Sequence, residues 1–252
     1  MKWIVREMKK YFSGIHQRAV EETEAEKAYD IWSATYDDQP DNLMLALDED
    51  IFSKLIGKLD IENKIVADIG CGTGRHWQKI LDHKPSTVSG FDVSGGMLEQ
   101  LRQKFPAAIT HKITNSLFDR VPTASFDLII STLTIAHVED LNTALEAWFR
   151  IAKQKSNIII TDFHPVALAK GGKRTFQKGG RQVSVKNFIH PIESIKLIAG
   201  KYGFRVAAQE EITINKEHKH YYEQQHALHV YEKFNGTPII YGLHLKRDDA
   251  TD

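Results

Sequence analysis

Three glycines at alternate positions follow a short apolar run that ends on an acid. The stretch reads Ile65-Val66-Ala67-Asp68-Ile69-Gly70-Cys71-Gly72-Thr73-Gly74. Because glycine has no Cβ, such a loop turns sharply and lets its backbone approach a ligand closely. A helix is expected after Gly74, and its free N–H groups suit a carboxylate or a phosphate. The stretch therefore predicts a cradle for a nucleotide-type cofactor, with Asp68 placed to accept a hydrogen bond from a ligand amino group.

A second acid, Asp92, closes the next strand-like run. A carboxylate at this place accepts hydrogen bonds from both hydroxyls of a ribose. Ser94 is the better cap for the helix that follows, which leaves Asp92 free for a ligand. The dinucleotide fingerprint G-x-G-x-x-G requires glycine where this chain has Arg75, so an NAD(P)-dependent oxidoreductase is a weaker alternative that stays open.

The elements that position these residues alternate between strand-like and helical patterns. Strands are expected at 64–69, 87–91, 107–113, 126–131, 157–161, 204–214 and 238–246, and helices at 75–81, 95–105, 140–152 and 194–202. Alternation of this kind implies right-handed crossovers and a parallel sheet with helices on both faces. The sequence therefore predicts an α/β fold with a doubly wound, seven-stranded, mostly parallel sheet.

Other segments lie outside this alternation. Residues 1–60 predict a helical N-terminal segment, and residues 61–252 form the main domain. Insertions at about 163–190 and 215–235 are expected to form a cap. In the first insertion, strand-like runs flank Gly179-Gly180 and predict a hairpin.

Composition narrows the classes of function. The chain has 252 residues, with 33 Lys and Arg against 33 Asp and Glu, so its formal net charge is zero. Nucleic-acid binders usually carry a basic surplus, so we expect no nucleic-acid partner. No run is apolar enough for a membrane span or a signal peptide, and the single cysteine, Cys71, excludes an internal disulfide. These features predict a cytoplasmic protein, and they leave its oligomeric state open.

Together the motifs resemble those of the class I S-adenosylmethionine-dependent methyltransferases, and in particular the small-molecule methyltransferases of quinone-biosynthesis type. The matching segments are 29–37, 68–74, 90–94, 125–131 and 134–140. The match at 29–37 implies that the N-terminal segment, residues 1–60, covers the cofactor site. Several motifs that occur together in the family's order are far more specific than the glycine loop alone. The resemblance implies a Rossmann-like methyltransferase fold, with S-adenosyl-L-methionine as cofactor and S-adenosyl-L-homocysteine as product.

The resemblance also implies roles for matching residues. Asp68 and the loop residues Gly70, Cys71, Gly72, Thr73 and Gly74 would hold the methionine part, and Asp92 would hold the ribose. The other expected cofactor contacts are Trp32, Tyr36, Val93, Met97, Asn115, Ser116, Ser131 and Thr132. Asn115 departs from the family pattern, which often has an acid there. An aromatic face stabilises a sulfonium cation, which is why Trp32 and Tyr36 are included.

Methyl transfer to oxygen or nitrogen often needs a base beside the acceptor. His137 and His164 are the catalytic candidates because each follows an expected strand, at the edge where open α/β sheets bind ligands. The expected acceptor contacts are His190, His220, Tyr221, Tyr222 and His226. The cationic stretch 170–174 is typical of a patch that binds a phosphate or an acidic substrate, and an ordered stretch would help to close the site as a lid. The alternative is a solvated, mobile loop. No metal site is expected, because the histidine-rich stretch has no cysteine and few carboxylates.

The sequence therefore predicts an S-adenosylmethionine-dependent methyltransferase that acts on a small molecule, at oxygen. Two alternatives from other classes stay open: an NAD(P)-dependent oxidoreductase, and a non-catalytic protein that binds S-adenosylmethionine as a scaffold or sensor. The acceptor itself matches no motif in the chain.

Overall fold

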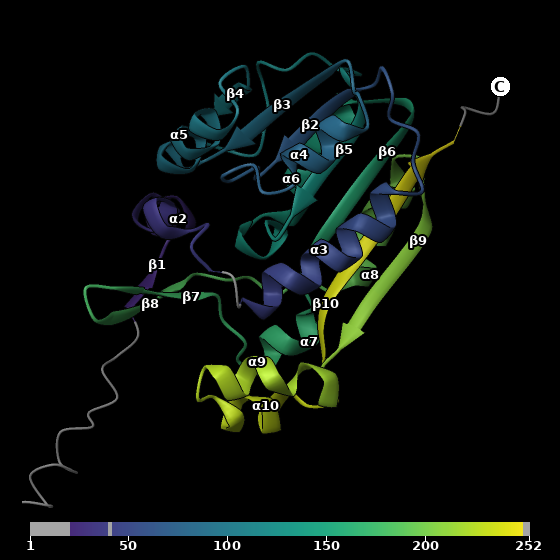
Figure 1. The fold of residues 1–252 in the computed structure, drawn as a ribbon. Helices are drawn as coiled ribbons and strands as arrows, with labels where there is room; N and C mark the ends of the chain where they lie inside the picture. The colour runs from purple at the N-terminus through teal and green to yellow at the C-terminus, as the bar shows by residue number, and fades with distance from the viewer. Residues whose placement is uncertain (1–20, 40–41, 249–252) are drawn as a thin grey trace, which may run out of the picture.

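A seven-stranded sheet forms the centre of the computed structural model, which describes residues 21–39 and 42–248 (Figure 1). Its strand order is β4-β3-β2-β5-β6-β10-β9. In chain order the strands are β2 (Ile65–Ile69), β3 (Thr87–Asp92), β4 (Ile109–Lys112), β5 (Phe126–Thr132), β6 (Ala152–Phe163), β9 (Phe204–Thr213) and β10 (Pro238–Arg247). β10 is antiparallel to both of its neighbours, whereas the other neighbouring pairs are parallel. The predicted doubly wound, mostly parallel sheet is confirmed.

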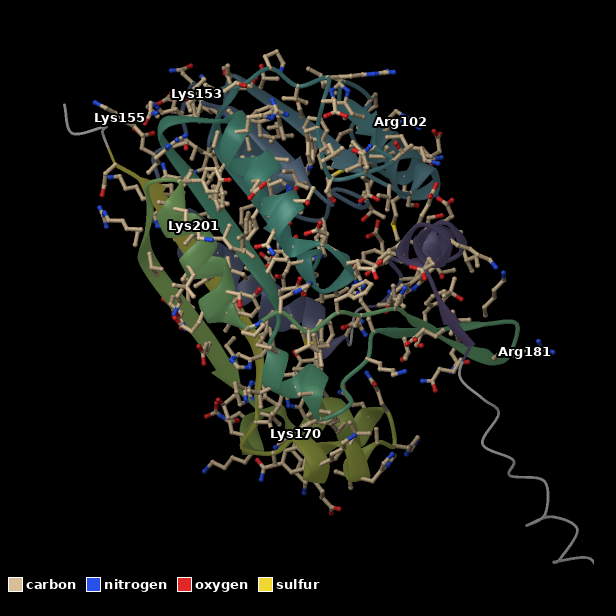
Figure 2. The ribbon with its side chains drawn as sticks, turned by 180° about the vertical axis from the view of Figure 1, so that it is seen from behind. Arg102, Lys153, Lys155, Lys170, Arg181 and Lys201 are labelled. Carbon is tan, nitrogen blue, oxygen red and sulfur yellow. The ribbon has the colours of Figure 1, made fainter. Side chains whose placement is uncertain are left out.

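Helices cover both faces of the sheet because its central strands carry apolar side chains on both sides. Successive residues of a strand point to opposite faces, so Val66 and Leu128 join one hydrophobic cluster while Ala67 and Ile129 join another. The first face carries α3 (Leu43–Ile56), α4 (Trp77–Asp82) and α5 (Gly95–Lys104), and the second carries α6 (Leu141–Ile151) and α8 (Ile192–Lys201). Figure 2 shows the second face, with α6 and α8 toward the viewer.

The observed boundaries lie close to the predicted ones, with one exception. β6 begins at Ala152, well before the expected residue 157, and its pairing with β5 shifts register near this start. Lys155 lies within this early part with a positive φ of 59°. The predicted cap of α5 is confirmed, because the Ser94 hydroxyl accepts a hydrogen bond from the Met97 N–H at 3.1 Å.

The N-terminal segment is helical as predicted, except at its start. α2 (Ala25–Trp32), the 3-10 turn η1 (Ser33–Thr35) and α3 follow one another, but β1 (Glu21–Thr23) is a strand that pairs with the first insertion. Strand pairing therefore overrides the helical pattern there. The expectation for residues 1–20 lies outside the described residues.

The first insertion forms the predicted hairpin. β7 (Thr175–Lys178) and β8 (Arg181–Val185) are antiparallel, and Gly179 and Gly180 both have positive φ, as a two-residue hairpin turn requires. β8 also pairs with β1 in a small sheet of order β1-β8-β7. Buried side chains of α2, α5 and the hairpin form a third hydrophobic cluster that joins this sheet to the main domain.

The second insertion is helical rather than an irregular loop. It contains η3 (Lys216–His218), α9 (Lys219–Gln224) and α10 (Leu228–Phe234), which lie beside α7 (Pro165–Ala169) at one end of the molecule (Figure 1). Among residues 21–39 and 42–248, every helix is too short or too polar to cross a bilayer.

Candidate cofactor and acceptor site

A cavity of about 630 Å³ opens at the carboxyl ends of β2, β3 and β5. The strand order reverses between β2 and β5, and open α/β sheets bind their ligands at such a point. The volume falls within the range of about 300–1,000 Å³ that is usual for small-molecule sites. Its position and size therefore suit a nucleotide-type cofactor together with part of an acceptor.

The glycine loop forms one wall of this cavity. Gly70 and Gly72 have φ of 72° and 53°, in the left-handed region that favours glycine. A Cβ on Gly70 would lie 2.1 Å from Oγ1 of Thr134, whereas a Cβ on Gly72 would meet no atom of the described chain within 4 Å. Gly70 thus allows close packing of two loops, and Gly72 presents bare backbone to the cavity.

Asp92 holds the loop and still offers free lone pairs. Its two carboxylate oxygens accept hydrogen bonds from the N–H groups of Gly72 and Ser94, each at 2.8 Å. Since each oxygen has two lone pairs, both can also accept from ribose hydroxyls. Burial raises the pKa of Asp92 to about 6 despite these bonds.

Asp68 is the second acid on the cavity wall. One of its oxygens accepts a hydrogen bond from the indole N–H of Trp77 at 2.8 Å. Burial raises the pKa of Asp68 to about 6, so its charge lacks compensation in the ligand-free protein. An ammonium group is the partner that such a carboxylate suits. Apolar Val93, Met97 and Phe118 provide a surface for an adenine ring.

These residues fit S-adenosylmethionine. The open backbone at Gly72 and the two acids match the amino acid and ribose parts, and the apolar wall matches the base. Asn115 lines the same region, and its side-chain oxygen accepts a hydrogen bond from the N–H of Leu117 at 2.9 Å. The side-chain oxygen of Asn115 therefore keeps one lone pair for a ligand, although the family often has an acid at this position.

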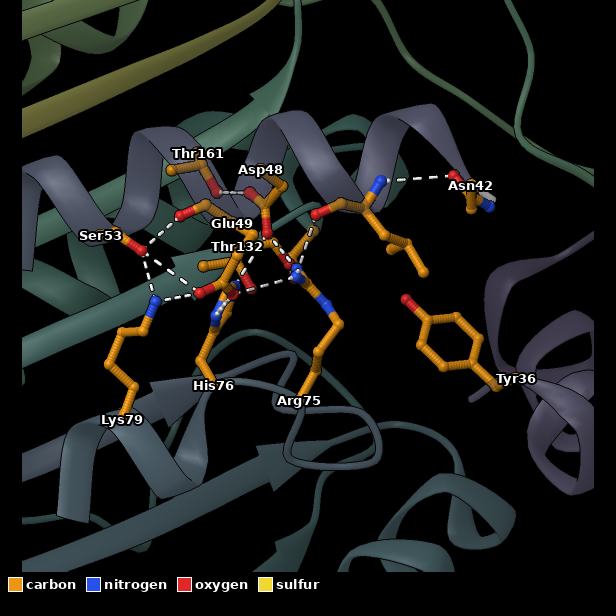
Figure 3. Close-up of polar contacts among 12 residues, drawn as sticks. Tyr36, Asn42, Asp48, Glu49, Ser53, Arg75, His76, Lys79, Thr132 and Thr161 are labelled. Atoms are coloured by element: carbon orange, nitrogen blue, oxygen red, sulfur yellow. Dashed lines mark hydrogen bonds and ion pairs between the residues drawn. The ribbon is translucent and has the colours of Figure 1, made fainter. Parts of the chain in front are cut away.

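Arg75, the residue that replaces a dinucleotide glycine, belongs to an ionic network behind the loop (Figure 3). Its guanidinium pairs with Asp48 of α3, and Nε2 of His76 lies 2.8 Å from the same carboxylate. The hydroxyl of Thr161 donates to the other oxygen of Asp48. Burial by itself would raise the pKa of Asp48, but the His76 hydrogen bond and the Arg75 charge lower it to about 2.

This network fixes α3 against the loop. Asp48 is completely buried, so its three partners supply the stabilisation that water gives an exposed carboxylate. Lys79 adds contacts to Glu49, the residue after Asp48, and to Ser53, about one turn further along α3. In the sequence, Arg75 is notable only because it stands where the dinucleotide fingerprint G-x-G-x-x-G requires a glycine. In the structure, Arg75 helps to hold α3 against the glycine loop through its ion pair with Asp48.

The acceptor end of the cavity carries a hydrogen-bonded pair, Tyr29 and His137. The phenol oxygen of Tyr29 lies 2.9 Å from Nε2 of His137, and Nδ1 of His137 lies 2.9 Å from the carbonyl oxygen of Lys186. A carbonyl oxygen only accepts, so Nδ1 carries the proton and Nε2 accepts from Tyr29. Burial lowers the pKa of His137 to about 4 and raises that of Tyr29, which keeps both groups neutral at pH 7.

Most of the predicted cofactor residues lie on the cavity wall. They are Tyr36, Asp68, Gly70, Cys71, Gly72, Thr73, Asp92, Val93, Met97, Asn115, Ser116 and Thr132, together with the catalytic candidate His137. Gly74 lies behind the wall, where a Cβ would come within 3.0 Å of Leu101. The hydroxyl of Ser131 is buried without a hydrogen-bond partner among the described residues, and Trp32 stacks on Phe176 at 4.7 Å.

The other predicted residues lie away from the cavity. His164 caps α7 by accepting from the N–H of Val166 at 3.2 Å, and burial lowers its pKa. His190 donates to the carbonyl oxygen of Val138 at 2.7 Å and lines a second depression. The expected acceptor residues His220, Tyr221, Tyr222 and His226 belong to the second insertion. The acceptor and catalytic roles of these residues stay predictions.

Three residues near the cavity lie in segments that the sequence singled out but were not among the expected site residues: Tyr29, Thr134 and Arg174. Tyr29 lies seven positions before Tyr36, a spacing that places both on one helical side, and this signal was available. Thr134 follows Leu133, whose φ of 52° turns the chain back over Gly70. Arg174 comes from a cationic stretch in which sequence alone does not show which side chain points inward.

Comparisons with known proteins agree with this geometry. Residues 67–160 match the family described as methyltransferase domain. A tRNA U34 carboxymethyltransferase of Helicobacter pylori is 27% identical over 158 residues, which is 57% of each chain. An O-methyltransferase of Aspergillus sclerotiorum is 26% identical over 42% of this chain and 44% of its own. The chain therefore spans about half the length of the curated relatives that it matches.

A solved structure extends the likeness to most of the fold. The S-adenosylmethionine dependent methyltransferase from Mesorhizobium loti covers 81% of this chain and 100% of its own, with a TM-score of 0.61 and 18% identity. At this identity the match concerns the fold, while the family match concerns the segment that holds the glycine loop and Asp92. Together they show that residues 67–160 match a methyltransferase domain and that the chain shares its fold with an S-adenosylmethionine dependent methyltransferase.

Proposed function

We propose that this protein transfers the methyl group of S-adenosylmethionine to an oxygen atom of a small-molecule acceptor. The observation that carries the proposal is the composition of the cavity. Its acids and apolar side chains suit the cofactor, and its other end holds the neutral Tyr29–His137 pair. The cofactor supplies an electrophilic methyl group on a sulfonium ion.

The chain's own residues would bind and orient both reactants. Asp68 would accept from the cofactor's amino group and Asp92 from the ribose hydroxyls, while the backbone at Gly72 comes close to the amino acid part. Holding reactants in line and excluding water contributes much of the rate in a transfer of this kind. The α2 helix and the β7–β8 hairpin would close the acceptor side, because they share a hydrophobic cluster beside the cavity.

Tyr29 and His137 offer a route for the proton that an acceptor hydroxyl loses. The phenol oxygen of Tyr29 would accept the acceptor's proton while Tyr29 passes its own proton to Nε2 of His137. When bound, the cofactor would supply the methyl group for the new bond to oxygen and would keep on its sulfur the electron pair of the carbon–sulfur bond. This route assigns His137 a base role through Tyr29.

A tRNA acceptor is the second candidate, and the Helicobacter pylori relative favours it. The charge distribution favours a small molecule instead. The formal net charge is zero, and the six cations labelled in Figure 2 lie on several different elements. RNA binding depends mainly on a basic surface that follows the phosphates.

Product formation from fractionated acceptors separates these candidates. The protein is incubated with methyl-labelled S-adenosylmethionine and either total tRNA or the small-molecule fraction of a cell extract. We expect label in the small-molecule fraction, and mass spectrometry of the labelled product should place the methyl group on oxygen. Label in tRNA alone would reverse the assignment.

Cofactor binding is measured separately by calorimetry. Binding of S-adenosylhomocysteine but not of NADPH would dismiss the oxidoreductase alternative. Binding without turnover on either fraction would favour the non-catalytic alternative.

A further inference from the structure

Arg174 carries a buried positive charge that lacks an anionic partner. It precedes β7 in the first insertion, and only 4% of its surface is exposed. Arginine is seldom buried to this extent unless it is paired. Its guanidinium lies 5.3 Å from the ring centre of Trp32 and 5.5 Å from that of Tyr36, and one N–H donates to the Tyr36 hydroxyl at 2.6 Å.

The acids around Arg174 are committed elsewhere. Within residues 21–39 and 42–248, no carboxylate forms an ion pair with it, and its Nε has no hydrogen-bond partner. Asp48 and Asp162 are close enough to act on its charge. Asp48 is bound by Arg75, His76 and Thr161, while Asp162 accepts from the backbone N–H groups of Ala136 and Phe163.

Removing a guanidinium from water is costly unless a partner compensates. Contacts with the aromatic faces of Trp32 and Tyr36 offset part of that cost but do not neutralise the charge. The protein therefore maintains a charge whose natural partner is an anion that enters from outside.

Tyr36 connects this charge to the cavity. The Tyr36 side chain lines the cavity and accepts from Arg174 through its oxygen, so its own O–H remains available to donate. Nε and the terminal nitrogens of arginine form a planar fork that matches the two oxygens of a carboxylate. A carboxylate at the acceptor end would satisfy the fork and the phenol together.

We propose that Arg174, with Tyr36, binds a carboxylate group of the acceptor, so that the substrate is an organic acid that carries the methylated hydroxyl. The inference rests on the proposed methyl transfer. The cavity wall then has the acids Asp68 and Asp92 at the cofactor end, and Arg174 places a cation behind Tyr36, which lines the same cavity. An anionic acceptor would be oriented by this field before it reacts.

The carboxylate of the cofactor's methionine part shares this chemistry, so the test separates the two sources. The protein is saturated with S-adenosylhomocysteine and titrated with hydroxybenzoates, short hydroxy acids and the methyl ester of each, with melting temperature as the readout. We expect acids to stabilise the complex and their esters to have at least tenfold weaker effects. Equal effects of acids and esters, or no effect of either class, would overturn the proposal.

Variants complete the test. Arg174→Gln should abolish the response to acids while S-adenosylhomocysteine binds within twofold of wild type. Arg174→Lys, which keeps the charge but loses the fork, covers the case in which Arg174→Gln fails to fold, and it should weaken the response at least fivefold. Lys173→Gln is the matched control, since Lys173 is exposed and pairs with Glu22 at 3.2 Å.

Binding of 5′-methylthioadenosine, which lacks the amino acid part, distinguishes the source. If Arg174→Gln weakens S-adenosylhomocysteine tenfold but leaves 5′-methylthioadenosine unchanged, the carboxylate belongs to the cofactor and the acceptor assignment is wrong. If the wild-type protein binds neither S-adenosylhomocysteine nor 5′-methylthioadenosine, the proposed function itself is contradicted.

Discussion

The hydroxyl of Tyr29 donates to Nε2 of His137, and this bond joins helix α2 to the turn after β5. The carbonyl of Lys186 fixes the other ring nitrogen as a donor, so the first insertion determines the tautomer. Three segments that are distant in sequence thus set one proton position beside the cavity.

Tyr29→Phe and His137→Gln should each lower turnover about 100-fold, within the range that general base catalysis contributes. Cofactor affinity should stay within twofold, because neither residue is assigned to the cofactor. Single-turnover kinetics and calorimetry provide the two readouts. Tyr202→Phe is the control, since Tyr202 stacks on Phe149 in the core cluster that packs against the second face of the sheet. Unchanged turnover in both variants would remove the proton route.

The ionisation of His137 can be followed directly. Its pKa is lowered to about 4, so the ring should stay neutral as the pH falls through 6.5, where free histidine titrates. NMR of the ring nitrogens between pH 4 and 8 measures this. A midpoint near 6.5 would show that the ring is accessible to water.

Asp92→Asn should weaken S-adenosylhomocysteine binding by about 1–3 kcal/mol, the effect of losing charged hydrogen bonds. The pH dependence follows from the raised pKa values of about 6 for Asp68 and Asp92. Both acids are protonated below pH 6, so affinity should rise from pH 5 to pH 7 and then level off. In Asp92→Asn this rise should be smaller, and a flat wild-type profile would contradict the assignment.

The raised pKa values of Asp68 and Asp92 also make the stability of the ligand-free protein depend on pH. A carboxylate whose folded pKa is raised contributes stability below its unfolded pKa of about 4, and this contribution is lost as the pH rises through about 6. The cofactor should therefore raise the melting temperature more at pH 8 than at pH 5.

Gly72→Ala and Gly179→Ala form a matched pair. Both glycines have a φ of 53°, and at each the built Cβ meets no atom of the described residues within 4 Å. The two variants should lose similar stability, about 1 kcal/mol from strained backbone. Only Gly72→Ala should weaken cofactor binding, by at least tenfold, because its methyl group occupies the cavity. Equal binding by both variants would show that the backbone at Gly72 does not approach the cofactor.

Asp48→Ala should destabilise the protein by about 3–5 kcal/mol, because it leaves Arg75 and His76 without their buried partner. Urea unfolding at pH 7 measures the change. Lys58→Ala, which breaks the exposed pair with Glu210 at 3.3 Å, should change stability by less than about 1 kcal/mol. Since the pKa of Asp48 is lowered to about 2, its contribution is present above pH 4 and is lost as the pH falls toward 2. Similar losses for both variants would contradict this role.

The features that the sequence predicted are those fixed by neighbouring residues. The glycine loop, the strand ends at Asp68 and Asp92, and the cap at Ser94 depend on spacing within a short stretch, and the structure has them where expected. β1 was missed because a strand of three residues is determined by its partner β8, which is far away in sequence.

The acceptor end was less predictable for the same reason. Arg174 lies in a stretch with Lys170 and Lys173, and only the packing of Trp32 and Tyr36 selects which cation is buried. Histidine positions near strand ends suggested both His137 and His164, yet the turn after β6 uses His164 to cap α7. Composition and periodicity do not show which cation of a stretch is buried or which histidine faces the cavity, because packing between distant segments decides both.

The close contact between α3 and β10 has a consequence for how the chain folds. A Cβ on Gly242 would lie 2.2 Å from Ile51, so the helix rests directly on the strand. During synthesis α3 leaves the ribosome early and β10 leaves it late. Part of the apolar side of α3 therefore stays uncovered until β10 has emerged, and exposed apolar surface of this kind makes a partly synthesised chain prone to aggregation.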